Sequence, residues 1–288
     1  MIQYTGQEHS MKKTMSIYQD KNKNIVDAQL YAELQQKAFW RQEEKVALFN
    51  ALGPLHPGTI EATLRLAEAR MLLGDVGGAL EYTKEAYQAR CKVFGEYHKD
   101  TVDAYLTLAD AYLNAEQPLE AKNIAQDVLR DDYPYDPDDL VVELDAKEIL
   151  ADAHQMLREF GAETKVRREL VADMEEIYGP NHPETLGSIE TLAESLDENG
   201  CPAQAIPLYE RLLSYMREEK NMEGVVMILC NLATCCQHVG QQGKALAFAE
   251  EAVRISKQTF GDDDDLTQTA IGYLGEITED NRFFSTKR

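Results

Sequence analysis

Four side chains of the kind that binds soft metal ions stand close together in the chain: Cys230, Cys235, Cys236 and His238. On one helix, at about 100° per residue, they point in directions of about 0°, 140°, 240° and 80°. A zinc site needs four ligands that converge on one point. These directions do not converge, so no metal centre is expected, and Cys236 is better explained as a small residue of a buried core.

Two acidic runs, Asp131–Asp139 and Asp262–Asp265, contain the residue type that binds Ca²⁺. Neither has the central glycine and final glutamate of an EF-hand loop. His56, His98 and His182 recur because a longer motif recurs, and capping or packing explains them better than catalysis. We therefore expect neither a calcium site nor a catalytic histidine.

Motifs of the common enzyme classes are missing from the sequence. There is no glycine-rich phosphate loop, no Gly-x-Ser-x-Gly turn and no His-Glu-x-x-His pair. No pair of carboxylates stands in an apolar setting that would separate their two pKa values. The sequence predicts a protein that is not an enzyme and that uses no cofactor.

The charge balance excludes one class of partner and favours another. The 288 residues contain 51 acids and 29 bases, which gives a net charge of −22. Proteins that bind nucleic acid need clustered Lys and Arg, so nucleic acid is not an expected partner. A field of this sign attracts cationic proteins or peptides.

The chain shows no sign of secretion or membrane insertion. The five cysteines are an odd number at irregular spacing, which indicates a reducing compartment rather than a disulfide framework. No stretch approaches the roughly 18 apolar residues of a membrane span, and the first residues lack an apolar signal region. We expect a cytoplasmic protein with no membrane contact.

A repeat of about 42 residues organises most of the chain. A Leu-Ala pair recurs at steps of 42, 42, 42 and 40 residues, and Leu274-Gly275 follows after another 42. The pairs are Leu66-Ala67, Leu108-Ala109, Leu150-Ala151, Leu192-Ala193 and Leu232-Ala233. A small residue recurs twelve positions after most of these alanines, as in Ala79 and Ala245. Each unit has helical apolar spacing and predicts two helices, A and B, that approach closely at the small residues.

The joints between units follow a second motif. It begins with a glycine at Gly53, Gly95, Gly179 and Gly261, and it ends six residues later with a threonine. The glycine can adopt the left-handed conformation that ends a helix, and the threonine can cap the next one. A unit of two helices cannot bury its apolar faces alone, so the units are expected to stack.

This pattern resembles the tetratricopeptide repeat, and specifically the 42-residue variety of kinesin light chains, over about residues 37–280. Leu66, Ala67, Gly74 and Ala79 match the core signature, and Gly-x-x-His-Pro-x-Thr matches the joint. The resemblance implies an all-α, right-handed superhelical solenoid of antiparallel helix pairs. The core Tyr of the signature is present only at Tyr112, and Asp131–Leu140 replaces one joint, where we expect an altered connection.

The boundaries predicted from this pattern are a polar tail over residues 1–24, a solenoid over 25–280 and a second tail over 281–288. The solenoid should contain about five full repeats and a partial repeat at each end. In the first partial repeat, helix A is expected within Asp27–Gln36 and helix B over Ala38–Ala51.

In a tetratricopeptide superhelix, as the resemblance implies, the A helices line a concave groove. With Leu66 and its equivalents as position 7, positions 2, 5, 9, 12 and 13 face that groove. Eleven of these 25 positions are acidic and none is Lys or Arg, whereas an average of 51 acids in 288 residues predicts about 4. The acids are Glu61, Glu68, Asp103, Asp110, Asp145, Glu148, Asp152, Glu190, Glu194, Asp197 and Glu198. Leu64 and Leu106 would add apolar anchors among them.

The predicted B helices are not acidic in the same way: they contain 15 acids and 13 bases, against 13 acids and 4 bases on the A helices. The concave surface is therefore predicted to bind a basic or amphipathic protein segment. The basic residues with which kinesin light chains accept acidic cargo are missing, and so is the clamp that holds chaperone C-termini, so neither ligand class is expected.

Three functions remain compatible with these features. The leading one is a monomeric, non-enzymatic scaffold that binds a protein or peptide in the groove. The second is a regulatory module, a sensor or inhibitor dedicated to one partner. The third is a structural protein whose repeat ends stack on further copies. The acidic face could also serve only solubility.

Overall fold

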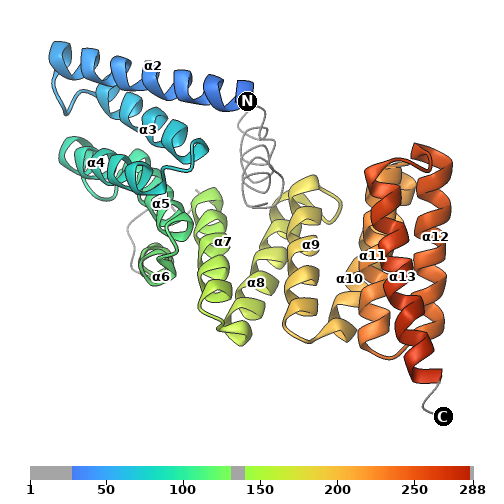
Figure 1. Cartoon of the computed structure of the whole chain (residues 1–288). Coiled ribbons are helices and arrows are strands. Elements are labelled where there is room, and N and C mark those ends of the chain that lie inside the picture. Colours follow the sequence, from blue (N-terminus) through green and yellow to red (C-terminus); the bar gives the residue numbers. More distant parts are fainter. Residues whose placement is uncertain (1–27, 131–139, 286–288) are drawn as a thin grey trace. The chain divides into compact units, whose positions relative to one another are not determined.

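The computed structural model describes residues 28–130 and 140–285, and in those residues all regular secondary structure is helical. The predicted all-α class is confirmed. The chain divides into two compact units, one ending at Glu159 and the other beginning at Phe160. In Figure 1 the helices follow one another as antiparallel neighbours within each unit.

The first unit contains six of the described helices. Its A helices are α3 (Pro57–Leu72), α5 (Lys99–Asn114) and α7 (Leu140–Met156), and its B helices are α2 (Ala28–Leu52), α4 (Val76–Phe94) and α6 (Pro118–Val128). Helix α4 packs on both α3 and α5, and α6 packs on both α5 and α7. Each B helix between two A helices thus contacts both, as in a stacked repeat.

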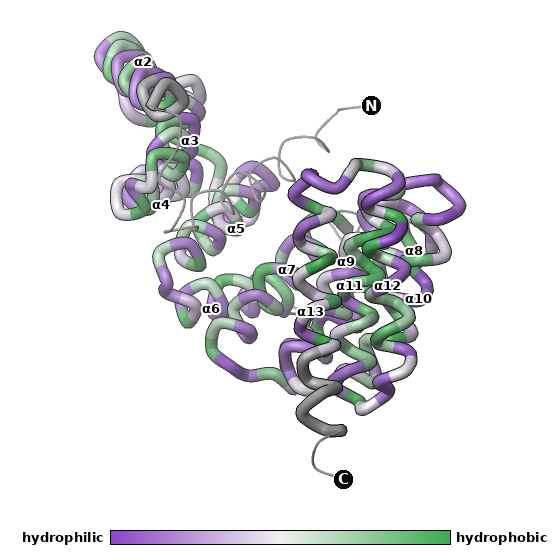
Figure 2. The backbone as a smooth tube through the Cα atoms, turned by 45° about the vertical axis from the view of Figure 1, so that its right-hand side comes forward, coloured by the Kyte–Doolittle hydropathy of each residue, from purple (hydrophilic) through white to green (hydrophobic). Residues whose placement is uncertain are grey.

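The second unit repeats this order. Its B helices are α8 (Phe160–Tyr178), α10 (Pro202–Glu218) and α12 (Gln242–Phe260), and its A helices are α9 (Pro183–Glu198), α11 (Met222–His238) and α13 (Asp265–Ser285). Helix α13 continues past residue 280, where the sequence pattern had suggested an end. Figure 2 shows hydrophobic and hydrophilic segments alternating along the helices, as expected for helices with one buried side.

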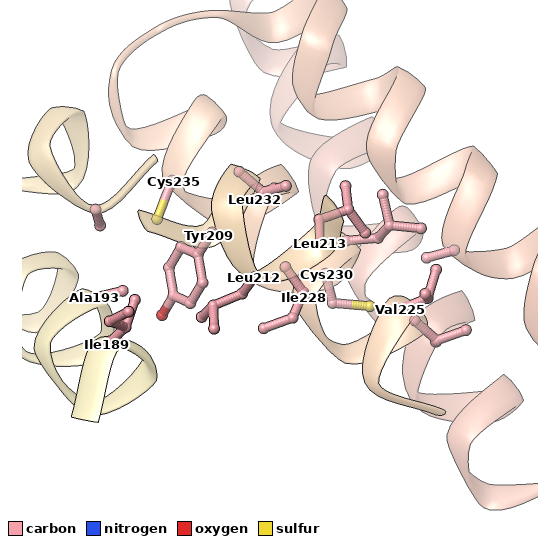
Figure 3. Packing of buried hydrophobic residues seen from close by; sticks show 14 of the residues in the cluster. Ile189, Ala193, Tyr209, Leu212, Leu213, Val225, Ile228, Cys230, Leu232 and Cys235 are labelled. Carbon is pink, nitrogen blue, oxygen red and sulfur yellow. The ribbon is translucent and has the colours of Figure 1, made fainter. Parts of the chain in front are cut away.

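The core of the second unit is built from the apolar stripes of successive helices. Tyr209 of α10 is only 2% exposed, and in Figure 3 its ring lies between Ile189 and Ala193 of α9 and Cys235 of α11. The small residues of the repeat are buried too, with Ala245 0% exposed. Close packing at these small residues is what joins helix A to helix B.

The joints between repeats end and start helices as predicted, but histidine rather than threonine forms the cap. His56, His98 and His182 are the N-caps, and each Nδ1 accepts a hydrogen bond from the backbone N–H two residues later, at 3.1, 3.2 and 3.3 Å. The ring of His98 also stacks on Phe94, and that of His182 on Tyr178. The histidine thus ties the end of one helix to the start of the next.

The threonine of the motif does not cap the next helix, so that expectation was wrong. In all four joints it is the third residue of the helix and is buried. Only the hydroxyl of Thr185 reaches back to the preceding helix; those of Thr59, Thr101 and Thr267 have no hydrogen-bond partner within the described residues. Thr185 donates to the carbonyl oxygen of Gly179 at 2.8 Å, and the carbonyl oxygen of Met174 lies 3.1 Å away. It satisfies acceptors at the end of helix α8, which would otherwise lack partners.

The turn between helices A and B has a fixed backbone conformation that does not depend on glycine. Gly74, Gly200 and Gly240 have φ between 74° and 76°, as the sequence predicts. Glu116 and Arg158 occupy the same place in their repeats and have φ of 56° and 58°. The packing of the two helices therefore imposes a left-handed residue here even where the side chain disfavours it.

The first partial repeat differs from its prediction. One continuous helix, α2, spans Ala28–Leu52, where two helices had been expected within Asp27–Gln36 and Ala38–Ala51. The sequence of α2 contains neither Gly nor Pro, so nothing stops the helix at residue 37. The predicted tail over residues 1–24 and the altered connection before Leu140 lie outside the described residues.

Candidate protein-binding surface on the A helices

The acids predicted to face the groove lie on the A helices, away from the buried stripes. In the first unit Glu61 and Glu68 are on α3, Asp103 and Asp110 are on α5, and Asp145, Glu148 and Asp152 are on α7; each is exposed or half-buried. Helix α5 packs directly against α7. The acids of these two helices therefore belong to adjoining surfaces.

The two apolar residues predicted beside these acids offer little surface. Leu106 is 5% exposed, and Leu64 packs on the cluster formed by Ile60, Ala86 and Ala89. Both side chains mainly join helix A to its neighbours. An apolar anchor of a bound segment would find more exposed area at Met156 of α7, which is 43% exposed.

Two acids of α3 already have positive neighbours. Glu61 forms ion pairs with Arg65 at 3.5 Å and with Arg90 at 3.8 Å. The pKa of Glu68 is raised because neighbouring helices displace water around its carboxylate and because Glu61 repels it, although Lys37 partly offsets this. The negative charge of these two α3 acids is therefore partly compensated by nearby bases.

Helix α9 carries a row of three acids in the second unit. Glu190, Glu194 and Glu198 are spaced four residues apart on one side of the helix. The pKa of Glu194 is raised by partial loss of water and by the charges of Glu190 and Glu198. The field reaches inside the core, since burial and then the charge of Glu194 raise the pKa of Tyr209 far above its usual range.

Asp197, a predicted groove residue, contacts two members of the cysteine–histidine group. Its Oδ1 lies 3.0 Å from Nδ1 of His238, which connects α9 to α11. Burial, the charge of Asp197 and a hydrogen bond to it raise the pKa of the Cys235 thiol to about 12. A thiol with so high a pKa is a poor nucleophile and a poor metal ligand at neutral pH.

The remaining cysteines of this group lie in apolar surroundings. Cys230 is 4% exposed and Cys236 is 1% exposed, so the interpretation of Cys236 as a small core residue is confirmed. Burial raises the pKa of Cys230 to about 11. Within residues 28–130 and 140–285, no three His, Cys, Asp or Glu side chains are grouped so that they could hold a metal ion.

The bases of the chain serve mainly on the B helices, where they join neighbouring repeats. Lys45 of α2 binds Glu85 of α4 at 2.6 Å, and Arg217 of α10 binds Glu251 of α12 at 3.1 Å. Arg211 of α10 likewise reaches Glu175 of α8. These pairs explain physically why the B helices are balanced in charge while the A helices are acidic.

A buried polar network at the α8–α9 contact was not predicted. Glu163 occupies the place of the small residue in its repeat and is 0% exposed. Its carboxylate accepts hydrogen bonds from Ser195 at 2.7 Å, Arg167 at 2.9 Å and Asn199 at 3.1 Å. Burial alone would raise the pKa of Glu163, but these three donors together lower it.

A signal for this network was present in the sequence. Ser195 stands where three earlier repeats have alanine, namely Ala69, Ala111 and Ala153, and Glu163 itself replaces an alanine. Simultaneous polar replacements at facing small positions indicate a hydrogen-bonded pair, because a lone buried carboxylate would be too costly.

Among the helices in the described part of the chain, none combines the length and the apolar character needed to cross a membrane.

Comparison with known proteins supports the repeat architecture. Residues 187–258, which span most of α9 to α12, match the family model of the tetratricopeptide repeat. No protein of curated function matches the chain in sequence.

Several solved structures share the fold at low sequence identity. A kinesin light chain-like protein from Podosopora anserina with nearly identical TPR-like repeats has a TM-score of 0.60 and 22% identity, and the match covers 71% of this chain and 98% of that one. BtubC (BKLC) from P. vanneervenii has a TM-score of 0.61 and 17% identity, with 82% and 92% covered. PilW, a type IV pilus biogenesis factor, has a TM-score of 0.56 and 14% identity, with 84% and 96% covered. Residues 187–258 are therefore tetratricopeptide repeats, and most of the chain has the fold of kinesin light chain-like tetratricopeptide repeat proteins.

Proposed function

We propose that this protein is a non-enzymatic scaffold that binds a basic or amphipathic protein segment on the acidic face of its A helices. The observation that best supports this is the row of Glu190, Glu194 and Glu198, spaced four residues apart on one side of α9. Partial loss of water and then the charges of the other two acids raise the pKa of Glu194. The free energy of carboxylates that repel one another falls when a cationic ligand approaches, because the ligand offsets their repulsion. The tetratricopeptide repeats over residues 187–258 and the fold of the chain are consistent with a scaffold.

The charge distribution supports this class of ligand. The proposed binding residues are the acids Glu61, Glu68, Asp103, Asp110, Asp145, Glu148, Asp152, Glu190, Glu194 and Asp197, with Leu64 and Leu106 shaping the surface from below. None of the 25 predicted groove positions is Lys or Arg. Such a surface repels phosphate backbones and acidic peptides, and it attracts lysine- and arginine-rich segments.

The protein is proposed to act as a monomer in the cytoplasm, without a cofactor. Its five cysteines are free, which suits a reducing compartment. Its leading alternative is a regulatory module that uses the same surface for one dedicated partner. A scaffold should retain several partners from a lysate of its own cells at low salt, whereas a dedicated module should retain one at fixed stoichiometry.

A titration with two matched peptides tests the ligand class. One is a labelled amphipathic peptide of lysine and leucine, and the other is the same peptide with glutamate in place of lysine. The basic peptide should bind and the acidic one should not. Equal binding of both peptides, or of neither, would refute the proposed ligand class.

A further inference from the structure

Helix α2 exposes an apolar face on the side away from α3. Phe39 is 58% exposed, Trp40 61% and Val46 44%, and Ala47 is exposed as well. These four residues form two adjacent pairs seven positions apart, so they share one face of the helix. On the opposite side Ala38 is 4% exposed where α2 packs on α3. We call Phe39, Trp40, Val46 and Ala47 the outer face of α2.

Comparison with the next repeat shows that part of this face normally lies under a helix. Ala89 of α4, 42 residues after Ala47, is 8% exposed because it packs with Ile60 and Leu64 of α3, the A helix of the same repeat. Within the described residues no A helix precedes α2. Ala47 is exposed for that reason, and the repeat that contains α2 lacks half of its core.

The other half of the face is unusual for this chain. The residues 42 positions after Phe39 and Val46 are Glu81 and Gln88, both exposed on α4. Phe39 and Val46 are large and apolar where α4 has polar residues. They therefore make the exposed apolar area of α2 larger than Ala47 alone would make it. Glu43 lies between the two apolar pairs, so the outer face combines exposed apolar side chains with one acid, and large exposed apolar side chains of this kind often mark an interaction site.

The chain itself contains a segment of fitting pattern directly before α2. Met11, Met15 and Tyr18 follow the spacing i, i+4, i+7 of one helix face, and Lys12, Lys13 and Lys21 fall outside that stripe. As a helix, residues 11–22 would be about 18 Å long, enough to cover the roughly 12 Å from Phe39 to Ala47.

The length of the link to α2 and the charges of the two segments are compatible with this contact. Residues 23–27 would form the link, and connections of about 2–8 residues commonly join packed helices. Glu43 of α2 is exposed in the turn between the two pairs of the outer face, where the lysines of the segment could reach it.

We propose that residues 11–22 of this chain pack as a helix on the outer face of α2, over Ala47 as α3 lies over Ala89 and also over the neighbouring Phe39, Trp40 and Val46. A tail in this position shields apolar surface that would otherwise invite aggregation.

The protein has a built-in reporter for this contact, since Trp40 is its single tryptophan. In the full chain, acrylamide should quench Trp40 much less than a free indole, at every protein concentration. The double variant Met15→Asp/Tyr18→Asp should raise the quenching constant to that of an exposed indole. The matched control Ser16→Asp/Asn24→Asp adds the same two charges away from the stripe and should leave quenching unchanged.

Amide hydrogen exchange gives a second measurement from the other side of the contact. Residues 11–22 should be protected in the wild-type chain and should lose that protection in Val46→Asp, which alters an exposed residue and leaves the rest of α2 folded. Free-indole quenching of the wild type, or equal quenching in both double variants, would overturn the proposal. Quenching that falls as protein concentration rises would overturn it too, because a second copy would then cover the face.

Discussion

Ser195 on α9 donates a hydrogen bond of 2.7 Å to the carboxylate of Glu163 on α8, a residue with 0% of its surface exposed. The corresponding positions are both alanine in two earlier repeats, Ala79 with Ala111 and Ala121 with Ala153, and both are small or apolar in the two later ones, Ala205 with Cys235 and Ala245 with Ile277. The contact between these two helices therefore depends on polar complementarity, and it should respond differently to mutation from the apolar contacts elsewhere.

Removal of one donor should destabilise the second unit. Ser195→Ala leaves the buried Glu163 carboxylate with one bond fewer, and the expected loss is about 1–3 kcal/mol of unfolding free energy. Glu163→Ala should cost more, about 3–5 kcal/mol, because Arg167 loses its buried partner. Urea unfolding measures both values.

A compensating variant distinguishes polar complementarity from simple loss of volume. Glu163→Ala/Arg167→Leu removes both charges, so it should be more stable than Glu163→Ala alone. A double variant that is less stable than the single one would contradict this account of the network.

Acid should weaken the second unit through Glu163. Hydrogen bonds lower the pKa of this carboxyl group in the folded state, so the folded state binds its proton less readily than the unfolded state. The resulting stability is present above the ordinary glutamate pKa and is lost as the pH falls through the lower, folded value. The melting temperature of Glu163→Gln should therefore fall less between neutral and acidic pH than that of the wild type.

Glu194 provides a control of opposite sign. Its pKa is raised in the folded state, so acidification favours the folded protein at this position. Glu194→Gln removes this stabilisation, so the melting temperature of the variant should fall more steeply with acidification than that of the wild type. Identical pH profiles for both variants would show that neither carboxylate is perturbed.

The histidine caps should each contribute measurably to stability. His98→Ala removes the acceptor for the backbone N–H of Asp100, and loss of an N-cap typically costs about 0.5–2 kcal/mol. His98→Asp should retain most of the stability, because Asp264 in the last joint accepts from the N–H of Leu266 at 2.9 Å. Chemical denaturation compares the two, and equal losses would mean that stacking on Phe94 matters more than capping.

The small residues at the helix crossing should not tolerate enlargement. Ala245 is 0% exposed, and Ala245→Leu should destabilise by about 1–3 kcal/mol through overpacking. Ala79→Leu should do the same in the first unit, where Ala79 is 1% exposed. Ala247→Leu, on an exposed position of the same helix α12, is the matched control. Unchanged melting temperatures for both core variants would show that the crossing lies elsewhere.

The repeat register was predictable because it rests on short-range periodicity. Leu-Ala pairs 42 residues apart, helical apolar spacing and glycine before each joint are local signals, and the helices follow them closely. Roles inside the joint were harder to predict. Histidine and threonine can both cap a helix, and only the path of the backbone makes Thr185 face the preceding helix instead.

Three features were not predicted from the sequence: the continuous helix α2, the burial of Leu106 and the polar network of Glu163. The expected break in α2 required an interruption that its sequence does not contain. Leu106 was placed on the binding surface by position alone, but its neighbours bury it. The buried network of Glu163 could be predicted only by comparing two replacements at once, Glu163 in one helix and Ser195 in the next, and these belong to different repeats.

The most direct test of the proposed function compares charge reversal on two sides of the same unit. The inner variant is Glu190→Lys/Glu194→Lys/Glu198→Lys on α9. The outer variant is Glu176→Lys/Glu210→Lys/Glu250→Lys, at exposed B-helix acids; Glu85 is unsuitable as a control because it binds the nearly buried Lys45.

Both variants should fold, since all six side chains lie on helix surfaces, exposed or, for Glu190, half-buried, and surface substitutions usually change stability by less than about 0.5 kcal/mol each. The measurement is the affinity of the basic lysine–leucine peptide for each variant, at about 0.1 M and about 1 M salt, where the screening length falls from roughly 10 Å to 3 Å. The account predicts that the inner variant loses binding at low salt, that the outer variant keeps it, and that salt weakens the wild type. Equal losses in the inner and outer variants would contradict it, because the attraction would then come from the overall charge and not from the A-helix surface.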